Sequence, residues 1–205
     1  HKKNSSLVVA LDYLKNNEDC IGLISAGSTG AVLTGGFLKI GRMKGVSRPA
    51  LAPLFPTQTG GQVVLIDCGA NVDCKPINLC HFALMGAEYF KTMFNVDNPR
   101  VALLSNGTED KKGNELVKQT FPLLKKLPIN FVGNMEARYF MTGQYDVVVA
   151  DGFAGNVLLK AVEGSVKFTT GVIKSAMMSS LKSKIGALLC KNSLKKVKDK
   201  LDYNK

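Results

Sequence analysis

Histidine is scarce in this sequence, and several familiar motifs are missing from it. Only His1 and His81 are present, and the nucleophile motif G-x-S-x-G does not occur. A Ser-His-Asp hydrolase needs a histidine base beside its nucleophile, so this class is poorly supported. The dinucleotide-binding pattern G-x-G-x-x-G and the P-loop lysine are absent too, which argues against the usual nucleotide sites.

Long hydrophobic runs are also lacking. No stretch of about 18 uninterrupted apolar residues occurs, and the first residues carry no signal-peptide cleavage pattern. With 45% hydrophobic residues in 205, the chain can bury a substantial core. We therefore expect a globular, cytoplasmic protein.

The number and spacing of the cysteines argue against a disulfide framework and against a zinc site. The five cysteines are an odd number scattered through apolar stretches, which favours reduced, packed thiols over a disulfide framework. The spacing of Cys68, Cys74 and Cys80 matches no zinc signature, even with His81 added. We expect neither a metal nor a cofactor.

Arginine is absent from the C-terminal part, where most of the positive charge lies. Residues 160–205 hold eleven lysines and three acidic residues, a net charge of +8, while the whole chain carries +11. Without arginine or interleaved aromatic residues, this basic region is poorly suited to nucleic acid. An acidic protein partner or an anionic membrane surface fits it better.

Short β-rich runs alternate with longer helical patterns along the chain. Strands are expected at residues 21–25, 63–67, 101–105, 129–132 and 147–150, and helices at 31–40, 78–94, 114–125, 136–141 and from 154 onward. This rhythm predicts an α/β fold, a largely parallel three-layer sheet covered on both faces. We divide the chain into an α/β core, residues 1–156, and a helical arm, residues 157–205.

Four of the expected strands end in glycine beside a small polar residue. These ends are the loops at residues 25–30, 67–71, 105–109 and 151–156. In an open α/β sheet, ligands bind beyond the carboxyl ends of the strands, where glycine admits backbone N–H groups and helix N-termini favour anions. Four such loops predict a shared site for an anionic ligand.

The same loops resemble those of a known family in order and spacing. The segments SAGSTGA, IDCGANVDCKP, NGTEDKKGNEL and ADGFAGNVLLK are similar to motifs of bacterial PlsX-type phosphate acyltransferases, and the similarity runs from about residue 4 to the end. The resemblance implies transfer of a long acyl chain from acyl carrier protein to inorganic phosphate, at the entrance to phospholipid synthesis. It also implies a homodimer and a Rossmann-like fold related to isopropylmalate dehydrogenases and phosphotransacetylases.

The chain departs from the family pattern in three respects. It begins without methionine and lacks the family's opening strand with its D-x-M-G-G-D loop, and it stops before the family's glycine-rich stretch and last strand and helix. Ser28 stands where the family has asparagine, which keeps a hydrogen-bonding side chain of shorter reach. Cys68 stands where a small aliphatic residue is usual.

Acyl transfer to phosphate requires a phosphate cradle, oxyanion stabilisation and a route for the thiolate. Phosphate is already anionic near neutral pH, so positioning carries much of the catalysis. The predicted phosphate- and substrate-binding residues are Ser25, Gly27, Ser28, Thr29, Gly30, Asp67, Gly69, Asn71, Thr108, Asp151 and Gly152. The predicted catalytic residues are Lys111, Lys112, Glu109 and Asn156.

Each role has an alternative. Lys111 or Lys112 would supply positive charge and Glu109 would orient that lysine, but the charged run equally suits a solvated helix start. Asn71 and Asn156 would be neutral donors. Asp67 and Asp151 suit a structural role as acceptors of backbone N–H bonds as well as a catalytic one.

The arm is expected to form two long amphipathic helical stretches. One reading is a dimerisation arm with solvated lysines. The other is an apolar tip that enters the headgroup layer of the inner face of the cell membrane while lysines meet anionic lipids or the acidic carrier protein. The residues predicted to make the contact are Ile185, Leu188, Leu189 and Lys191.

Three rival functions remain open. One is a short-chain phosphate acyltransferase that uses acyl-CoA. Another is a metal-dependent decarboxylating dehydrogenase with Asp67, Asp73 and Asp151 as ligands, although none of the four arginines lies in the loops. The last is a non-catalytic membrane-associated scaffold whose polar loops are ordinary turns.

Overall fold

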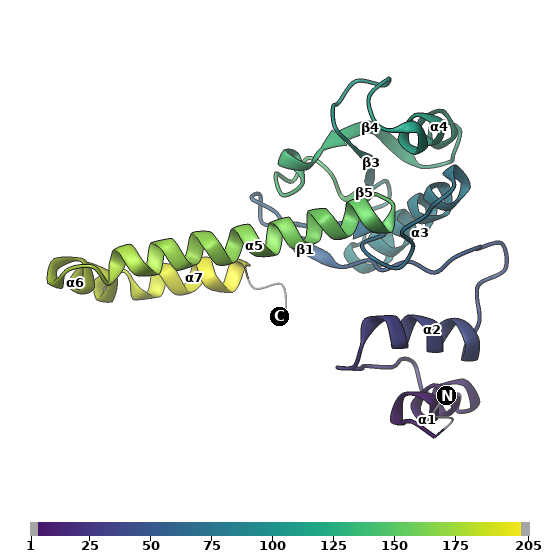
Figure 1. Ribbon diagram of the computed structural model, residues 1–205, viewed down its shortest axis with the longest axis horizontal. Coiled ribbons are helices and arrows are strands. Elements are labelled where there is room, and N and C mark those ends of the chain that lie inside the picture. Colours follow the sequence, from purple (N-terminus) through teal and green to yellow (C-terminus); the bar gives the residue numbers. More distant parts are fainter. Residues whose placement is uncertain (1–3, 202–205) are drawn as a thin grey trace. The chain divides into compact units, whose positions relative to one another are not determined.

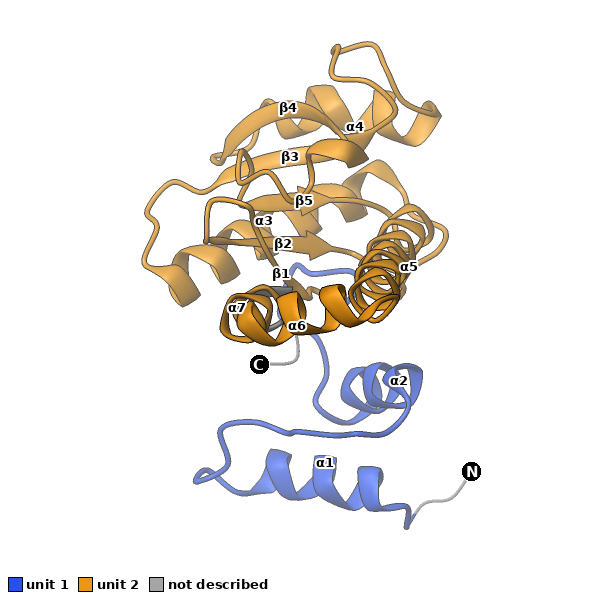
Figure 2. Ribbon diagram, turned by 90° about the vertical axis from the view of Figure 1, so that its left-hand side faces the viewer, with its two compact units in different colours: residues 1–50 blue, residues 51–205 orange. Residues whose placement is uncertain are grey.

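The chain forms two compact units, His1–Ala50 and Leu51–Lys205 (Figure 2). The computed structural model describes residues 4–201, without the side chains at positions 198, 200 and 201. His1 and the last four residues of the predicted arm therefore lie outside the described residues. The boundary between units falls after Ala50, and the division at residue 156 stays a prediction.

The first unit contains helices α1 (Ser6–Asn16) and α2 (Thr29–Lys39). The sequence pattern predicted α2 but gave no indication of α1. The helices approach closely at Gly35, where a Cβ atom would lie 2.6 Å from Leu11 Cδ1. Lys39 Nζ lies 2.9 Å from Asp12 Oδ2, which adds an ion pair between the two helices.

The strand predicted at residues 21–25 is wrong. These residues form a loop, and the side chains of Ile21 and Ile24 are fully exposed. A strand requires a neighbouring strand for its backbone hydrogen bonds. Between residues 4 and 50, the only regular elements are the two helices, so this apolar run has no strand partner there.

The second unit is built on a five-stranded sheet in the order β1-β2-β5-β3-β4. Its strands are β1 (Leu54–Pro56), β2 (Gln62–Ile66), β3 (Arg100–Ser105), β4 (Asn130–Glu136) and β5 (Val147–Val149). Strands β2, β5, β3 and β4 run parallel to one another, with Val149 opposite both Ile66 and Leu103, and β1 pairs antiparallel with β2. The largely parallel sheet is thus confirmed, and β1 is an additional antiparallel edge strand.

Helices cover both faces of this sheet. On one face, α3 (Pro76–Phe94) packs closely because Gly86 has no side chain; a Cβ atom there would lie 2.6 Å from Val147 Cγ1. Helix α4 (Glu115–Leu124) packs beside α3. On the other face, Leu158 of α5 (Gly152–Met177) joins a buried cluster with Leu65 and Val148.

The helix predicted at residues 136–141 is wrong in extent. Only a single 3-10 turn forms, η1 (Ala137–Tyr139). Glu136 still pairs with Ser105 at the end of β4, and Phe140 turns into the core. Too few residues remain between these two constraints to overcome the cost of starting an α-helix.

Up to residue 201, the described part of the arm holds three helices rather than the two expected. Helix α5 continues well beyond the sheet, and α6 (Leu181–Leu189) and α7 (Lys191–Leu201) lead back from its far end (Figure 1). Ser180 separates α5 from α6 because its hydroxyl accepts the N–H of Ser183 at 3.1 Å and so caps a new helix. Among the described helices, none is both long and apolar enough to cross a membrane.

Candidate active site

Asp67 organises the loop that follows β2. Its buried carboxylate accepts four backbone N–H bonds, from Leu51, Cys68, Ala70 and Asn71, at 2.7–3.1 Å. The side-chain amide of Asn71 donates a fifth bond at 2.9 Å. With both oxygens engaged by five donors, this carboxylate fixes the loop in place.

The loop after β2 contacts the start of α5 through main-chain atoms, at two glycines that have no side chain. Gly152 N donates to Asn71 O at 2.7 Å, and a Cβ on Gly155 would lie only 1.9 Å from the carbonyl oxygen of Asp67. Any side chain at these positions would push the segments apart. Asp151 caps α5 by accepting the N–H groups of Phe153 and Ala154 at 2.9 and 2.8 Å.

Asn156 lies at the same junction. A Cβ built on Gly69 would be 3.9 Å from the Asn156 amide oxygen, so the two residues are close neighbours. Unlike Asn71, Asn156 makes no side-chain hydrogen bond with any described residue. Its exposed amide is therefore available to a ligand.

The charged loop after β3 is held at its ends and in its middle. Asn106 Oδ1 accepts the N–H of Gly113 at 2.8 Å, which closes the loop at its base. Asn134, buried in β4, donates its amide to the carbonyl oxygen of Glu109 at 2.8 Å. Gly113 has a φ of +109°, a conformation that side chains disfavour. The loop is thus a defined structure rather than a loose helix start.

The cations of this loop are not neutralised by their neighbouring acid. Asp110 pairs instead with Lys125, at 2.7 Å. Over Gly107, the Glu109 carboxylate and the stem of Lys112 come together: a Cβ built there would be 2.7 Å from both. Lys111 and Lys112 are exposed and form no ion pair with the described residues.

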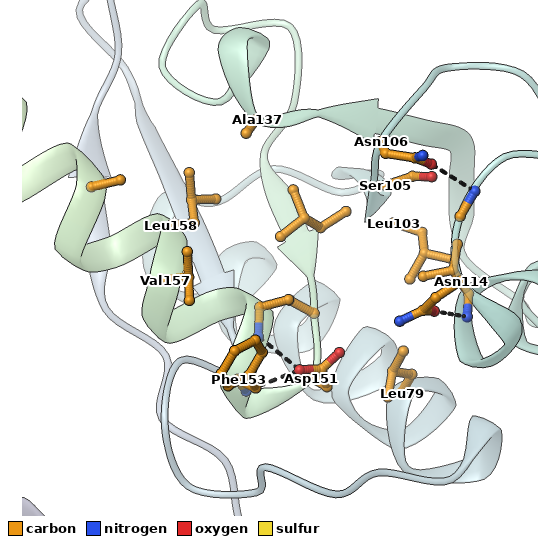
Figure 3. A pocket seen from close by; sticks show the side chains of 16 residues that line it. Leu79, Leu103, Ser105, Asn106, Asn114, Ala137, Asp151, Phe153, Val157 and Leu158 are labelled. Carbon is orange, nitrogen blue, oxygen red and sulfur yellow. Dashed lines mark hydrogen bonds between the residues drawn. The ribbon is translucent and has the colours of Figure 1, made fainter.

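A pocket of about 540 Å³ opens at the carboxyl edge of β3 and β5 (Figure 3). Leu103, Leu158 and Phe153 contribute to its largely apolar wall, and Ser105, Asn106, Asn114 and Asp151 form its polar part. The pocket includes the two ends of the charged loop, Asn106 and Gly113, but neither Lys111 nor Lys112.

The loop at residues 25–30 belongs to the other unit. It is exposed, and it leads into α2 with Ser28 at the N-cap. The Ser28 hydroxyl makes no capping hydrogen bond, while Ser25 Oγ accepts the N–H of Gly27 at 3.2 Å. The first N–H groups of α2 therefore face solvent without a side-chain cap, as an anion site requires.

Three of the four predicted loops thus meet at one edge of the sheet. They carry Asp67, Gly69, Asn71, Thr108, Glu109, Lys111, Lys112, Asp151, Gly152 and Asn156. Ser25, Gly27, Ser28, Thr29 and Gly30 lie in the first unit, and Ile185, Leu188, Leu189 and Lys191 are exposed on the arm. Their roles in binding and catalysis stay predictions.

Sequence reasoning missed the apolar residues of the pocket. Phe153 and Val157 line it although 64% and 54% of their surfaces are exposed. Asn114 could have been found, because asparagine directly before an amphipathic helix is a common N-cap. It does cap α4, accepting the N–H of Val117 at 2.9 Å.

Cys68 is poorly suited to act as a nucleophile at this site. Burial raises the pKa of the Cys68 thiol to about 11, and the negative charge of Asp67 acts in the same direction. The thiol is therefore protonated at neutral pH and a poor nucleophile. Within residues 4–201, no three His, Cys, Asp or Glu side chains form a group that could hold a metal ion.

Comparison with known proteins assigns the chain to a family. A family model described as "Fatty acid synthesis protein" matches residues 1–205. The chain belongs to this family. It is 52% identical over 202 residues to the phosphate acyltransferase of Exiguobacterium sibiricum and 50% identical over 203 residues to that of Bacillus cereus. The resemblance to PlsX-type phosphate acyltransferases is confirmed.

The coverage of these matches is uneven. They include 98% and 99% of this chain but only 61% of each relative. The chain thus spans about three fifths of the length of the curated relatives that it matches.

Solved structures with low sequence identity share the fold. A phosphotransacetylase from Staphylococcus aureus has a TM-score of 0.53 at 22% identity, covering 69% of this chain and 49% of its own. A branched-chain phosphotransacylase from Enterococcus faecalis has a TM-score of 0.53 at 17% identity, covering 76% and 62%. The predicted phosphotransacetylase-like fold is confirmed.

Proposed function

We propose that this chain transfers a long-chain acyl group from acyl carrier protein to inorganic phosphate, giving acyl phosphate for phospholipid synthesis. The observation that carries the proposal is the meeting of three glycine-bearing loops at the carboxyl edge of a parallel sheet, in a chain whose relatives are named phosphate acyltransferases. Exposed amides and lysines on loops at one edge of the sheet suit an anionic reactant.

The reaction is an addition followed by an elimination. A phosphate oxygen attacks the thioester carbonyl carbon, and the carbonyl electrons move onto oxygen. When the carbonyl re-forms, the carbon–sulfur bond breaks and the thiolate leaves with that electron pair, later taking a proton from solvent. The protein has to hold phosphate against the carbonyl and stabilise the transient oxyanion.

We assign these tasks to the predicted residues. The loop from Ser25 to Gly30, with the free N–H groups of α2, binds phosphate in this proposal. Asn156, whose amide is exposed beside Gly69, donates to the oxyanion. Asp67 and Asp151 hold the loops, since their carboxylates already accept backbone N–H bonds.

Of the two lysines, we assign the catalytic charge to Lys112. Its stem and the Glu109 carboxylate converge over Gly107, so Glu109 is in position to orient that ammonium group. In this proposal Glu109 directs the ammonium group toward the reacting atoms, which is what electrostatic stabilisation of the oxyanion requires.

The test is acyl phosphate formation from palmitoyl acyl carrier protein and inorganic phosphate. We expect Lys112→Ala to lower the rate by roughly 10²–10³-fold, as does the loss of other groups that stabilise a transition-state charge. Lys111→Ala, an equally exposed neighbour, should stay within a few-fold of the unmodified chain.

The Exiguobacterium sibiricum relative serves as a positive control for the assay. If it forms acyl phosphate while this chain does not, the proposed activity is wrong for this chain. Turnover of acetyl-CoA in place of the acyl carrier protein substrate would instead favour the short-chain reading.

The arm provides the proposed partner surface. Ile185, Leu188 and Leu189 expose 54%, 70% and 81% of their surfaces on α6. Exposed lysines flank them, namely Lys182, Lys184, Lys191, Lys195 and Lys196. An apolar tip within a basic surface suits peripheral binding to anionic lipid, and the lysines suit an acidic carrier protein. A homodimer remains part of the proposal.

A further inference from the structure

The pocket at the carboxyl edge has no part in the roles assigned above, apart from Asp151 at its rim. At about 540 Å³ it falls within the size range of small-molecule sites. Its walls come from separate elements, with Leu79 in α3, Leu103 in β3 and Leu158 in α5. A cavity lined in this way favours an apolar ligand, since water inside it would find few hydrogen-bond partners.

One end of the pocket is polar and carries a directed donor. Asn114 Oδ1 accepts the N–H of Val117, which fixes the orientation of the amide and leaves Nδ2 as the remaining polar atom. Figure 3 shows that nitrogen on the pocket side of the helix. It donates to no described residue. Nearby, Ser105 Oγ is buried without a hydrogen-bond partner among the described residues.

We infer that this pocket binds the acyl chain of the donor, with the Asn114 amide donating to the acyl carbonyl oxygen. An apolar cavity with a single polar end matches a molecule that is apolar along its length and has one acceptor group at its head. The inference rests on the proposed function, which supplies the acyl group. It also accounts for Phe153 and Val157, whose exposed apolar surfaces at the rim extend the wall.

The test measures binding rather than turnover. Fluorescence of cis-parinaric acid, a long-chain fatty acid, reports its binding to the unmodified chain, and palmitic or hexanoic acid competes with it. Because each buried methylene strengthens binding by about fourfold, palmitic acid should compete far better than hexanoic acid.

Val157→Trp should narrow the pocket and weaken cis-parinaric acid binding roughly tenfold, the effect of excluding one to two methylenes. Val172→Trp is the matched control, because Val172 lies on the same helix with 52% exposure against 54% and does not line the pocket. It should leave binding unchanged. Ala137→Phe narrows the pocket from a different element, η1, and repeats the test should Val157→Trp fail to fold.

Asn114→Asp tests the polar end. Aspartate caps a helix as well as asparagine does, so α4 should still begin at the same residue. The substitution replaces the Asn114 amide, a hydrogen-bond donor, by a carboxylate, which can only accept. We expect weaker binding of cis-parinaric acid with an unchanged far-ultraviolet circular dichroism spectrum.

The binding and turnover results test the pocket assignment and the proposed function independently of each other. If acyl phosphate forms but Val157→Trp and Ala137→Phe both bind the probe normally, the pocket assignment is overturned and the function stands. If no acyl phosphate forms but both variants lose binding, the pocket assignment holds and the function falls. A change in sedimentation of Val157→Trp with normal probe binding would mean that a second copy of the chain covers this surface, which also overturns the inference.

Discussion

At the scale of single residues, Asp67 shows how a buried carboxylate can be held mainly by backbone N–H groups. Its carboxylate has no ion-pair partner among the described residues, yet five N–H donors surround it. Four of these donors are backbone N–H groups, which are rigid, and the fifth is the side-chain amide of Asn71. The same donors would otherwise be unpaired in a buried loop, at a cost of about 1–3 kcal/mol each.

Asp67→Asn should therefore be strongly destabilising. One carboxylate oxygen becomes an NH₂ group that faces N–H donors, and we expect a loss of about 3 kcal/mol or more in the free energy of unfolding. Asp110→Asn is the control, since it removes the same charge from an exposed ion pair and should cost about 1 kcal/mol at most. Urea denaturation measures both, and equal effects would contradict a structural role for Asp67.

Cys68 gives the fold a dependence on alkaline pH. The unfolded thiol ionises near pH 9.0, whereas the pKa of the folded thiol is about 11. Between these values the unfolded chain releases a proton that the folded chain retains, so the free energy of unfolding falls as pH rises. The stabilisation is complete below pH 9 and is lost by about pH 11.

Comparison of the unmodified chain with Cys68→Ala isolates this effect. The stability difference between the two should shrink by about 2 kcal/mol from pH 8 to pH 11. A difference that stays constant over this range would show that the thiol titrates alike in both states. Tyr145, whose pKa is also raised by burial, changes both proteins equally and cancels.

At the scale of elements, α5 shows two opposite uses of glycine. At Gly155, backbone presses on backbone, and a Cβ would fall 1.9 Å from the carbonyl oxygen of Asp67. At Gly164, nothing lies within 4 Å of the corresponding position. The first glycine permits a contact that joins the helix to the site, and the second only makes the helix more flexible.

These two positions should respond in opposite directions to alanine. Gly155→Ala forces the β2 loop away from α5 and should cost more than about 3 kcal/mol. Gly164→Ala should instead stabilise the chain by about 0.5–1 kcal/mol, through helix propensity. Thermal unfolding followed by circular dichroism compares them, and the same sign for both would refute the packing argument.

Elements with a strong local pattern were predictable from the sequence. Helix α3 follows a long apolar period after Pro76, and β2, β3 and β5 are short buried runs. The run at residues 21–25 has the same local pattern, but the described part of its unit contains no strand with which it could pair. A local sequence pattern does not show whether a neighbouring strand will be present. The glycine loops were recognisable for a similar reason. The pocket, by contrast, is lined by residues from five elements, α3, β3, α4, η1 and α5, and is invisible in any one segment.

At the scale of the whole molecule, charge and apolar exposure coincide at one place. Most of the net charge lies in residues 160–205, which also carry exposed apolar side chains on α6. Either feature alone is common on protein surfaces. Together they predict an association with anionic vesicles that depends on both salt and an apolar contact.

Leu188→Glu should weaken binding to vesicles that contain phosphatidylglycerol by roughly tenfold or more, the effect of losing one buried leucine. Phe168→Glu makes the same change in charge at a residue of similar exposure, 74% against 70%, but on α5 away from the tip. Sedimentation with vesicles should show a loss only for Leu188→Glu. If the two variants bind alike, the tip makes no apolar contact.

Helix α5 also fixes a length. It runs for 26 residues without interruption, about 39 Å, from the Asp151 cap at the pocket to Met178 before the tip. Because its first turn is pressed against the β2 loop at Gly152 and Gly155, the helix acts as a rigid spacer. A lipid surface held at the tip would therefore stand a set distance from the chemistry. Under the proposed function, an acyl product leaving the pocket would have to cross that gap, so its synthesis and its delivery to the lipid would be separate steps.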